Sequence, residues 1–253
     1  MKSLGYEYVH LGNYWEPTGT NVDADFSLRY QEHSEFSAAL GSTTALMLLS
    51  PLGIPDDDPE TAPIRDIAVN TTLYTFERLE EAAGRPGPTY VFAHLLVPHP
   101  PYMFNADGTI ASRELTLSRP ETERYNQQLQ WTNTRVLEAL DRLLDVPADQ
   151  QPIIILQADE GPWPPGFTAD QRDFQWLDAT PQEIQQKMGI LNAFHLPGVD
   201  AAEFGIYDRI SPVNAFRIVF NAYFGADLPL LPDVSYLSPD YARMYDFREY
   251  PRD

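Results

Sequence analysis

Four short, continuously apolar runs constrain the fold of this chain more than any other feature of its sequence. They span residues 6–11, 90–97, 153–157 and 190–196. Runs of this length are typical of β-strands, and their continuous apolar character indicates a sheet that is covered on both faces. Pro98 follows the second run and Pro197 follows the fourth, and a proline is a poor residue with which to continue a central strand.

Segments with helical patterning separate these runs, at residues 63–83, 121–144 and 211–224. The third opens with Ser211 and Pro212, a favourable start for a helix, and Gly84 and Gly225 are suitable C-caps. The alternation of strands and helices predicts an α/β fold with a mainly parallel sheet and helices on both faces. We expect one domain over residues 1–253, with a surface tail at 232–253. Loops are predicted at 13–35, 105–120 and 161–178.

Composition excludes several classes of function. The 253 residues carry a net charge of −20 and only two lysines, so the field of the protein repels nucleic acid. The chain has no cysteine, which excludes disulfides, cysteine-ligated zinc and thiol nucleophiles. We expect no membrane-spanning segment, because the most apolar stretch, residues 45–49, is far too short.

Polar residues directly follow two of the predicted strands. Asp159, Glu160 and Gly161 come after the third run, and His99 comes after the second. Ligands bind beyond the carboxyl ends of parallel strands, so we expect His99 and Asp159 in one cleft, within roughly 10 Å of each other, a span judged from metal–oxygen bond lengths. Carboxylates ligate hard divalent cations, and an imidazole can contact an anionic substrate. Alternatively, the two acids cap the next segment and His99 is a turn residue.

Several motifs together resemble one protein family. Residues 90–104 (YVFAHLLVPHPPYMF) and 152–162 (PIIILQADEGP) are similar to the strand-end motifs of sulfatase-like domains in the alkaline phosphatase superfamily. Residues 2–15 (KSLGYEYVHLGNYW), 189–198 (GILNAFHLPG) and 211–231 resemble further parts of such domains, as found in bacterial membrane-anchored proteins. The resemblance covers nearly the whole chain.

The resemblance implies a site and a location. It implies an alkaline-phosphatase/sulfatase-like fold in which Asp159 ligates a divalent metal (Mg²⁺, Mn²⁺ or Ca²⁺) and Glu160 is a second ligand. It also implies that His99 contacts the anionic group of a phosphoric or sulfuric ester and that Asn13 lies near the substrate. The ester would be a small molecule or would be linked to a glycan or lipid. By the same resemblance the parent protein is anchored on the extracytoplasmic side of a bacterial membrane.

The sequence departs from the family pattern in two respects. The acidic strand end and the Ser, Thr or Cys nucleophile of the family precede its Gly-Tyr strand, whereas only residues 1–4 precede Gly5 here. We therefore expect a fragment without an assignable nucleophile. Glu160 stands where the family has histidine or asparagine, and its charge opposes an anionic substrate.

Two functional readings follow from these observations. The first is a fragment of a metal-dependent ester hydrolase or transferase domain that is inactive alone. The second is a non-catalytic, sulfatase-like scaffold with a binding or cell-envelope role. A glycosidase with a pair of catalytic acids is a third hypothesis, but no second carboxylate can be assigned to that role. His10, His94 and His195 lie within the apolar runs and are predicted to be structural.

Overall fold

The computed structural model of the protein describes residues 1–30, 62–164 and 174–250. These residues form two compact units, one within Met1–Asp145 and the other within Val146–Asp253. The single domain expected over residues 1–253 stays a prediction. The apolar stretch 45–49 lies outside the described residues.

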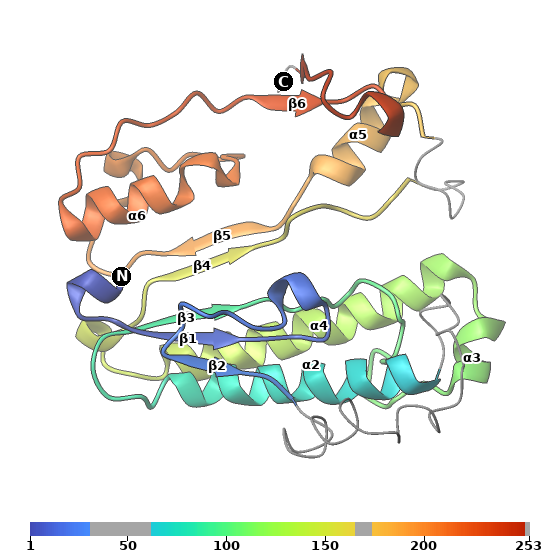
Figure 1. Ribbon diagram of the computed structural model, residues 1–253, viewed down its shortest axis with the longest axis horizontal. Coiled ribbons are helices and arrows are strands. Elements are labelled where there is room, and N and C mark those ends of the chain that lie inside the picture. Colours follow the sequence, from blue (N-terminus) through green and yellow to red (C-terminus); the bar gives the residue numbers. More distant parts are fainter. Residues whose placement is uncertain (31–61, 165–173, 251–253) are drawn as a thin grey trace, which may run out of the picture. The chain divides into compact units, whose positions relative to one another are not determined.

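The first unit contains a three-stranded parallel sheet (Figure 1). Its strands are β1 (Glu7–Leu11), β2 (Phe26–Leu28) and β3 (Thr89–Ala93), in the order β2-β1-β3. Val9 of β1 is paired with Phe26 on one side and Val91 on the other, and both pairings are parallel. The parallel relation of the first two predicted strands is thus confirmed. The loop predicted at 13–35 missed β2, which is only three residues long.

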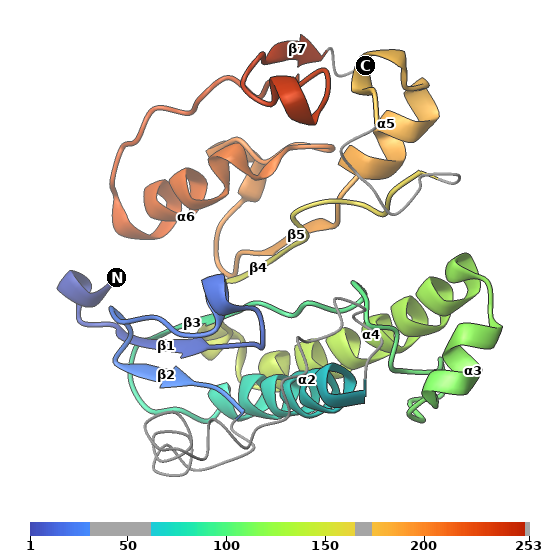
Figure 2. The ribbon, with the colours of Figure 1, turned by 45° about the vertical axis from the view of Figure 1, so that its right-hand side comes forward.

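The helices of the first unit agree with the sequence pattern. Helix α2 spans Ala62–Ala82 and α4 spans Glu121–Leu144, which confirms two of the predicted helices. Both lie on the same side of the sheet in Figures 1 and 2. Helix α3 (Arg113–Ser118) is a short addition within the loop predicted at 105–120, and the Ser112 side chain caps its start.

The core of this unit is rich in aromatic side chains. Phe104 and Trp131 stack with ring centroids 3.6 Å apart, and Phe76 meets Trp131 edge-on at 5.8 Å. All three side chains are at most 5% exposed. Such pairs stabilise a core through both buried area and ring geometry. They join α2, α4 and the loop after β3 into one layer.

The second unit is built around an antiparallel pair, β4 (Ile154–Gln157) and β5 (Asn192–His195). This antiparallel pair departs from the mainly parallel sheet expected from the sequence, because apolar runs identify strands but do not reveal their direction. Helix α5 (Pro181–Met188) lies between them in sequence, and α6 (Ala215–Phe224) follows β5. The fold of the described residues is therefore α/β, with a three-stranded parallel sheet and antiparallel pairs.

The C-terminal residues include a pair of short strands. Strands β6 (Ser235–Leu237) and β7 (Arg248–Tyr250) pair in antiparallel fashion within the segment predicted as a surface tail at 232–253.

Short 3₁₀ helices occur at Lys2–Leu4, Glu16–Thr18, Ala148–Gln150, Trp176–Asp178, Ala201–Phe204, Pro212–Asn214 and Tyr241–Arg243. Within the part of the chain that the structure describes, no helix is both long and apolar enough to cross a membrane.

Candidate functional site

His99 lies on a proline-rich loop after β3 and is exposed. The strand predicted at 90–97 ends earlier, at Ala93, so His99 lies further beyond the strand than expected. Its backbone N–H donates to Leu96 O at 2.9 Å, which closes a turn in place of the sheet pairing. Its ring nitrogen Nδ1 lies 2.7 Å from Pro100 O.

Buried side chains from two helices hold this loop. Arg65 of α2, only 5% exposed, donates to Tyr102 O at 2.8 Å and to Ala111 O at 2.6 Å. Thr116 of α3 also donates to Tyr102 O, at 3.3 Å. A buried guanidinium is costly unless it is hydrogen-bonded, so these contacts indicate that the conformation of the loop is strongly specified.

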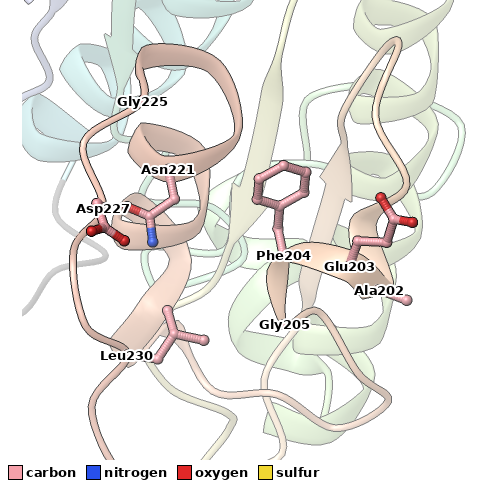
Figure 3. Close-up of a pocket in the computed structure, with 8 residues that line it drawn as sticks. All are labelled: Ala202, Glu203, Phe204, Gly205, Asn221, Gly225, Asp227 and Leu230. Carbon is pink, nitrogen blue, oxygen red and sulfur yellow. The ribbon is translucent and has the colours of Figure 1, made fainter.

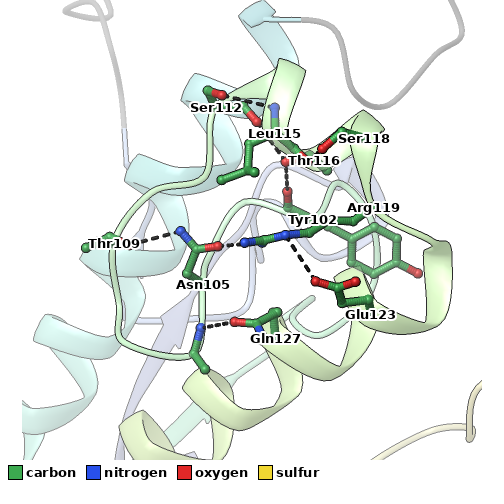
Figure 4. A network of polar contacts seen from close by, with 11 residues as sticks. Tyr102, Asn105, Thr109, Ser112, Leu115, Thr116, Ser118, Arg119, Glu123 and Gln127 are labelled. Atoms are coloured by element: carbon green, nitrogen blue, oxygen red, sulfur yellow. Dashed lines mark hydrogen bonds and ion pairs between the residues drawn. The ribbon is translucent and has the colours of Figure 1, made fainter.

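The polar network continues into the turn that follows the loop, as Figure 4 shows. Arg119 donates to Asn105 Oδ1 at 2.6 Å and lies 3.3 Å from a carboxylate oxygen of Glu123. The Gln127 side chain accepts the N–H of Ala106 at 2.9 Å. The loop is thus fixed at both of its ends.

Asn13 lies beyond the carboxyl end of β1 and is 3% exposed. Its Nδ2 donates to Thr18 Oγ1 and to His94 O, both at 2.9 Å, and its Oδ1 accepts the N–H of Trp15 at 2.8 Å. Thr18 Oγ1 is in turn 2.8 Å from His94 Nδ1. Asn13 therefore ties the loop after β1 to the loop after β3, and its role near a substrate stays a prediction.

Two aromatic side chains, Tyr14 and Trp15, adjoin this cluster. Burial raises the pKa of the neighbouring Tyr14 to about 12, so its phenol stays neutral at physiological pH. Trp15 is half-exposed, and its ring meets the His94 ring edge-on at 5.8 Å. The cluster thus offers an indole and an imidazole next to each other at the end of the parallel strands.

Asp159 and Glu160 form an exposed turn directly after β4. Asp159 Oδ1 accepts the N–H of Glu160 at 2.9 Å. The turn is held by the backbone, because Gly161 N–H donates to Lys187 O at 2.7 Å and Ala158 N–H donates to Leu191 O at 2.9 Å. A Cβ at Gly161 would lie 2.0 Å from Gln186 O, so only glycine permits this close approach to the end of α5.

Glu160 is engaged by a buried lysine. Lys187 Nζ lies 2.5 Å from Glu160 Oε1, and the Lys187 side chain is 8% exposed whereas that of Glu160 is 52% exposed. The contact is an ion pair without hydrogen-bond geometry. The same ammonium lies 3.9 Å from the centre of the Trp163 ring, a cation–π contact. This pair of charges was not predicted from the sequence.

Two further histidines, His10 and His195, have structural surroundings. His10 is 2% exposed and stacks on Phe92, and burial lowers its pKa. His195 Nε2 lies 3.1 Å from Gln151 Oε1.

A hollow of about 510 Å³ lies in the second unit, lined in part by Glu203, Asn221, Asp227 and Leu230 (Figure 3). Asn221 uses its amide to hold Leu228, donating to its carbonyl and accepting its N–H. None of the predicted site residues lines this hollow.

The structure therefore brings together only some of the predicted site residues. Asp159 and Glu160 share one turn, whereas Asn13 contacts His94, which was predicted to be structural. The approach of His99 to Asp159 stays a prediction because the two lie in different units. Among the described residues, no three His, Cys, Asp or Glu side chains gather as a ready metal cluster. Comparisons with protein-family models, curated proteins and solved structures found no significant match for this chain.

Proposed function

We propose that this chain is part of a metal-dependent phosphoric or sulfuric ester hydrolase or transferase domain of the sulfatase-like type. In this proposal Asp159 ligates a divalent cation, His99 contacts the anionic group of the ester, and Asn13 lies near the substrate. The finer fold belongs to the same proposal: a mainly parallel sheet, with helices on both faces, in a single domain. The attacking hydroxyl is not assigned to any of these residues.

The turn at Asp159 supports this proposal most strongly. It directly follows a strand, it is fixed by backbone hydrogen bonds to Lys187 and Leu191, and it leaves the carboxylate exposed. A carboxylate that fixed backbone hydrogen bonds present to solvent is a preorganised oxygen ligand for a cation. Gly161 shows that the sequence is adapted to this turn, since any side chain there would collide with α5.

The donor set fits a hard cation at one position better than at the other. Asp159 offers carboxylate oxygens, the ligand type that Mg²⁺, Mn²⁺ and Ca²⁺ prefer. Glu160 already faces the Lys187 ammonium, and a positive charge there opposes a second cation. A bound metal would supply polarisation of the ester and stabilisation of the leaving oxygen. We therefore assign the metal to Asp159 and give Glu160 the weaker role.

The Glu160–Lys187 pair also favours a second candidate, a non-catalytic scaffold of the same type with a binding or cell-envelope role. A carboxylate that neutralises a buried ammonium serves the stability of the turn and needs no metal.

An ester assay separates a complete site from an incomplete one. The full chain is incubated with phosphate and sulfate esters in the presence of Mg²⁺ or Mn²⁺, and Asp159→Ala is measured beside it. We expect both proteins to match the buffer control, because no nucleophile is assigned. Turnover by the wild type that Asp159→Ala abolishes would show a complete site and would overturn the proposal of an inactive fragment.

A further inference from the structure

The loop that carries His99 cannot satisfy its own backbone groups. Pro98, Pro100 and Pro101 have no N–H, so this stretch offers carbonyl acceptors with few backbone donors to pair them. Pro101 is fully buried, and so are Met103 and Phe104, which follow it. Buried carbonyls and N–H groups without partners would destabilise the loop, so another part of the unit has to pair them.

One side chain of α4 pairs most of these groups. Gln128 is 0% exposed, and its Nε2 donates to the carbonyls of Pro98, His99 and Pro101 at 3.3, 3.0 and 3.2 Å. Its Oε1 accepts the N–H groups of Met103 at 2.7 Å and Phe104 at 3.3 Å. Both ends of the amide are thus used, all of it on the backbone of one loop. Glutamine is rarely buried so fully, and these contacts explain why it is here.

The same loop selects one form of the His99 ring. Nδ1 lies 2.7 Å from the carbonyl oxygen of Pro100, which can only accept a hydrogen bond. Nδ1 therefore carries the proton, and in the neutral ring Nε2 keeps its lone pair. The side chain is exposed, so Nε2 is the nitrogen that this ring offers to a ligand.

We propose that Gln128 is the positioning residue of the His99 loop and that it fixes His99 in the Nδ1–H tautomer with Nε2 as the contacting atom. This rests on the proposed function only for the identity of the ligand, an ester anion. Nε2 accepts a hydrogen bond in the neutral ring and donates one to the anion only in the doubly protonated ring. Gln128 acts through His99 and touches no substrate itself.

The ring nitrogens report this arrangement directly. The full chain, labelled with ¹⁵N-histidine, is examined by two-bond ¹⁵N–¹H correlation in neutral buffer. We expect His99 to show one tautomer, with a pyrrole-type Nδ1 and a pyridine-type Nε2. A mixture of the two tautomers in the wild type would overturn the proposal, whether or not the chain belongs to a hydrolase.

A matched pair of variants tests the role of Gln128. Gln128→Glu keeps the acceptors for Met103 and Phe104 but removes the donors to the three carbonyls, and it should lose the single tautomer. Gln130→Glu makes the same change at an exposed position of α4 and should keep it. A folded Gln128→Glu protein that retains the single tautomer would remove Gln128 from the proposal.

If Gln128→Glu fails to fold, hydrogen exchange in the wild type tests the role of Gln128 instead. The side-chain amide protons of Gln128 should then exchange with solvent far more slowly than those of Gln130, because they are buried and bonded to three carbonyls. Equal exchange at the two positions would contradict the role given to Gln128.

Inorganic phosphate added to the wild type should shift the Nε2 signal of His99. No shift would reject the anion as the ligand while leaving the tautomer and its positioning intact.

Discussion

Replacing Glu160 by glutamine tests whether this acid is a structural partner of Lys187 or a metal ligand. The substitution keeps the shape of the side chain but leaves the Lys187 ammonium buried without its counter-charge. Breaking a fully buried pair costs about 3–5 kcal/mol, and losing a surface pair costs at most about 1 kcal/mol. Glu160 is half-exposed, so water replaces part of the lost interaction. We expect a loss of about 1–2 kcal/mol, between these two limits.

Lys187→Met is the second single variant of a double-mutant cycle with Glu160→Gln. It removes the ion pair and the cation–π contact but keeps an apolar side chain next to Trp163. The double variant Glu160→Gln/Lys187→Met has no unpaired ammonium. Its loss of stability should therefore be smaller, by about 1 kcal/mol, than the sum of the losses of the two single variants. The free energy of opening is measured by amide hydrogen exchange of α5. Glu203→Gln, an exposed acid of the same unit, is the control and should change it by less than about 0.5 kcal/mol.

The refuting result is specific. A stability of Glu160→Gln equal to that of the control, with no coupling to Lys187→Met, would show that the pair contributes nothing to the turn. If the same variant also lost affinity for Mn²⁺, Glu160 would be a ligand after all.

Three further predictions concern the first unit. Arg65→Met removes two hydrogen bonds from a buried cation to loop carbonyls and should destabilise the protein by about 3 kcal/mol in urea unfolding; a loss below about 1 kcal/mol would contradict the anchoring role. Burial lowers the pKa of His10 below its ordinary value of 6.5, so only the unfolded chain takes up this proton just below that pH. The stability that the neutral His10 ring contributes is complete above about pH 6.5 and is lost as the pH falls towards the pKa of the folded state. In urea unfolding, His10→Gln should flatten this part of the dependence of the unfolding free energy on pH. Phe104→Ala opens a cavity beside the indole on which it stacks and should cost about 3–5 kcal/mol by the same measurement, whereas exposed Phe247→Ala should stay within about 0.5 kcal/mol.

Strong periodic signals in the sequence predicted the longest elements well. The helix expected at 121–144 has the same bounds in the structure, because its apolar stripe is long and charges separate its members. Gly225 ends α6 in the left-handed conformation, as a C-cap glycine should. Strand direction was not predictable in the same way. An apolar run predicts a strand with two covered faces and carries no information on direction, and β4 and β5, which have such runs, are antiparallel and only partly buried.

The candidate site was predictable as residue types but not as contacts. Asp159 and His99 stand out because a strand ends before each of them. Lys187 acts through a partner far away in the sequence, so no local pattern reveals it. A signal did exist for Gln128, which is a polar residue on the helix face that also carries buried Trp131 and Thr132. A polar side chain at a buried helical position requires partners, and that requirement could have led to the loop.

Mn²⁺ added to the ¹⁵N-labelled full chain tests the central claim, that Asp159 holds a divalent metal, most directly. With a net charge of −20 the protein attracts cations over much of its surface, so binding alone decides nothing. Paramagnetic broadening locates the ion residue by residue. We predict that, at substoichiometric Mn²⁺, the amide signals of Asp159 and Gly161 disappear first, that Asp159→Asn abolishes this effect, and that Asp178→Asn, an exposed control in the same unit, preserves it. Broadening spread evenly over the acidic surface, and unchanged by Asp159→Asn, would contradict the account.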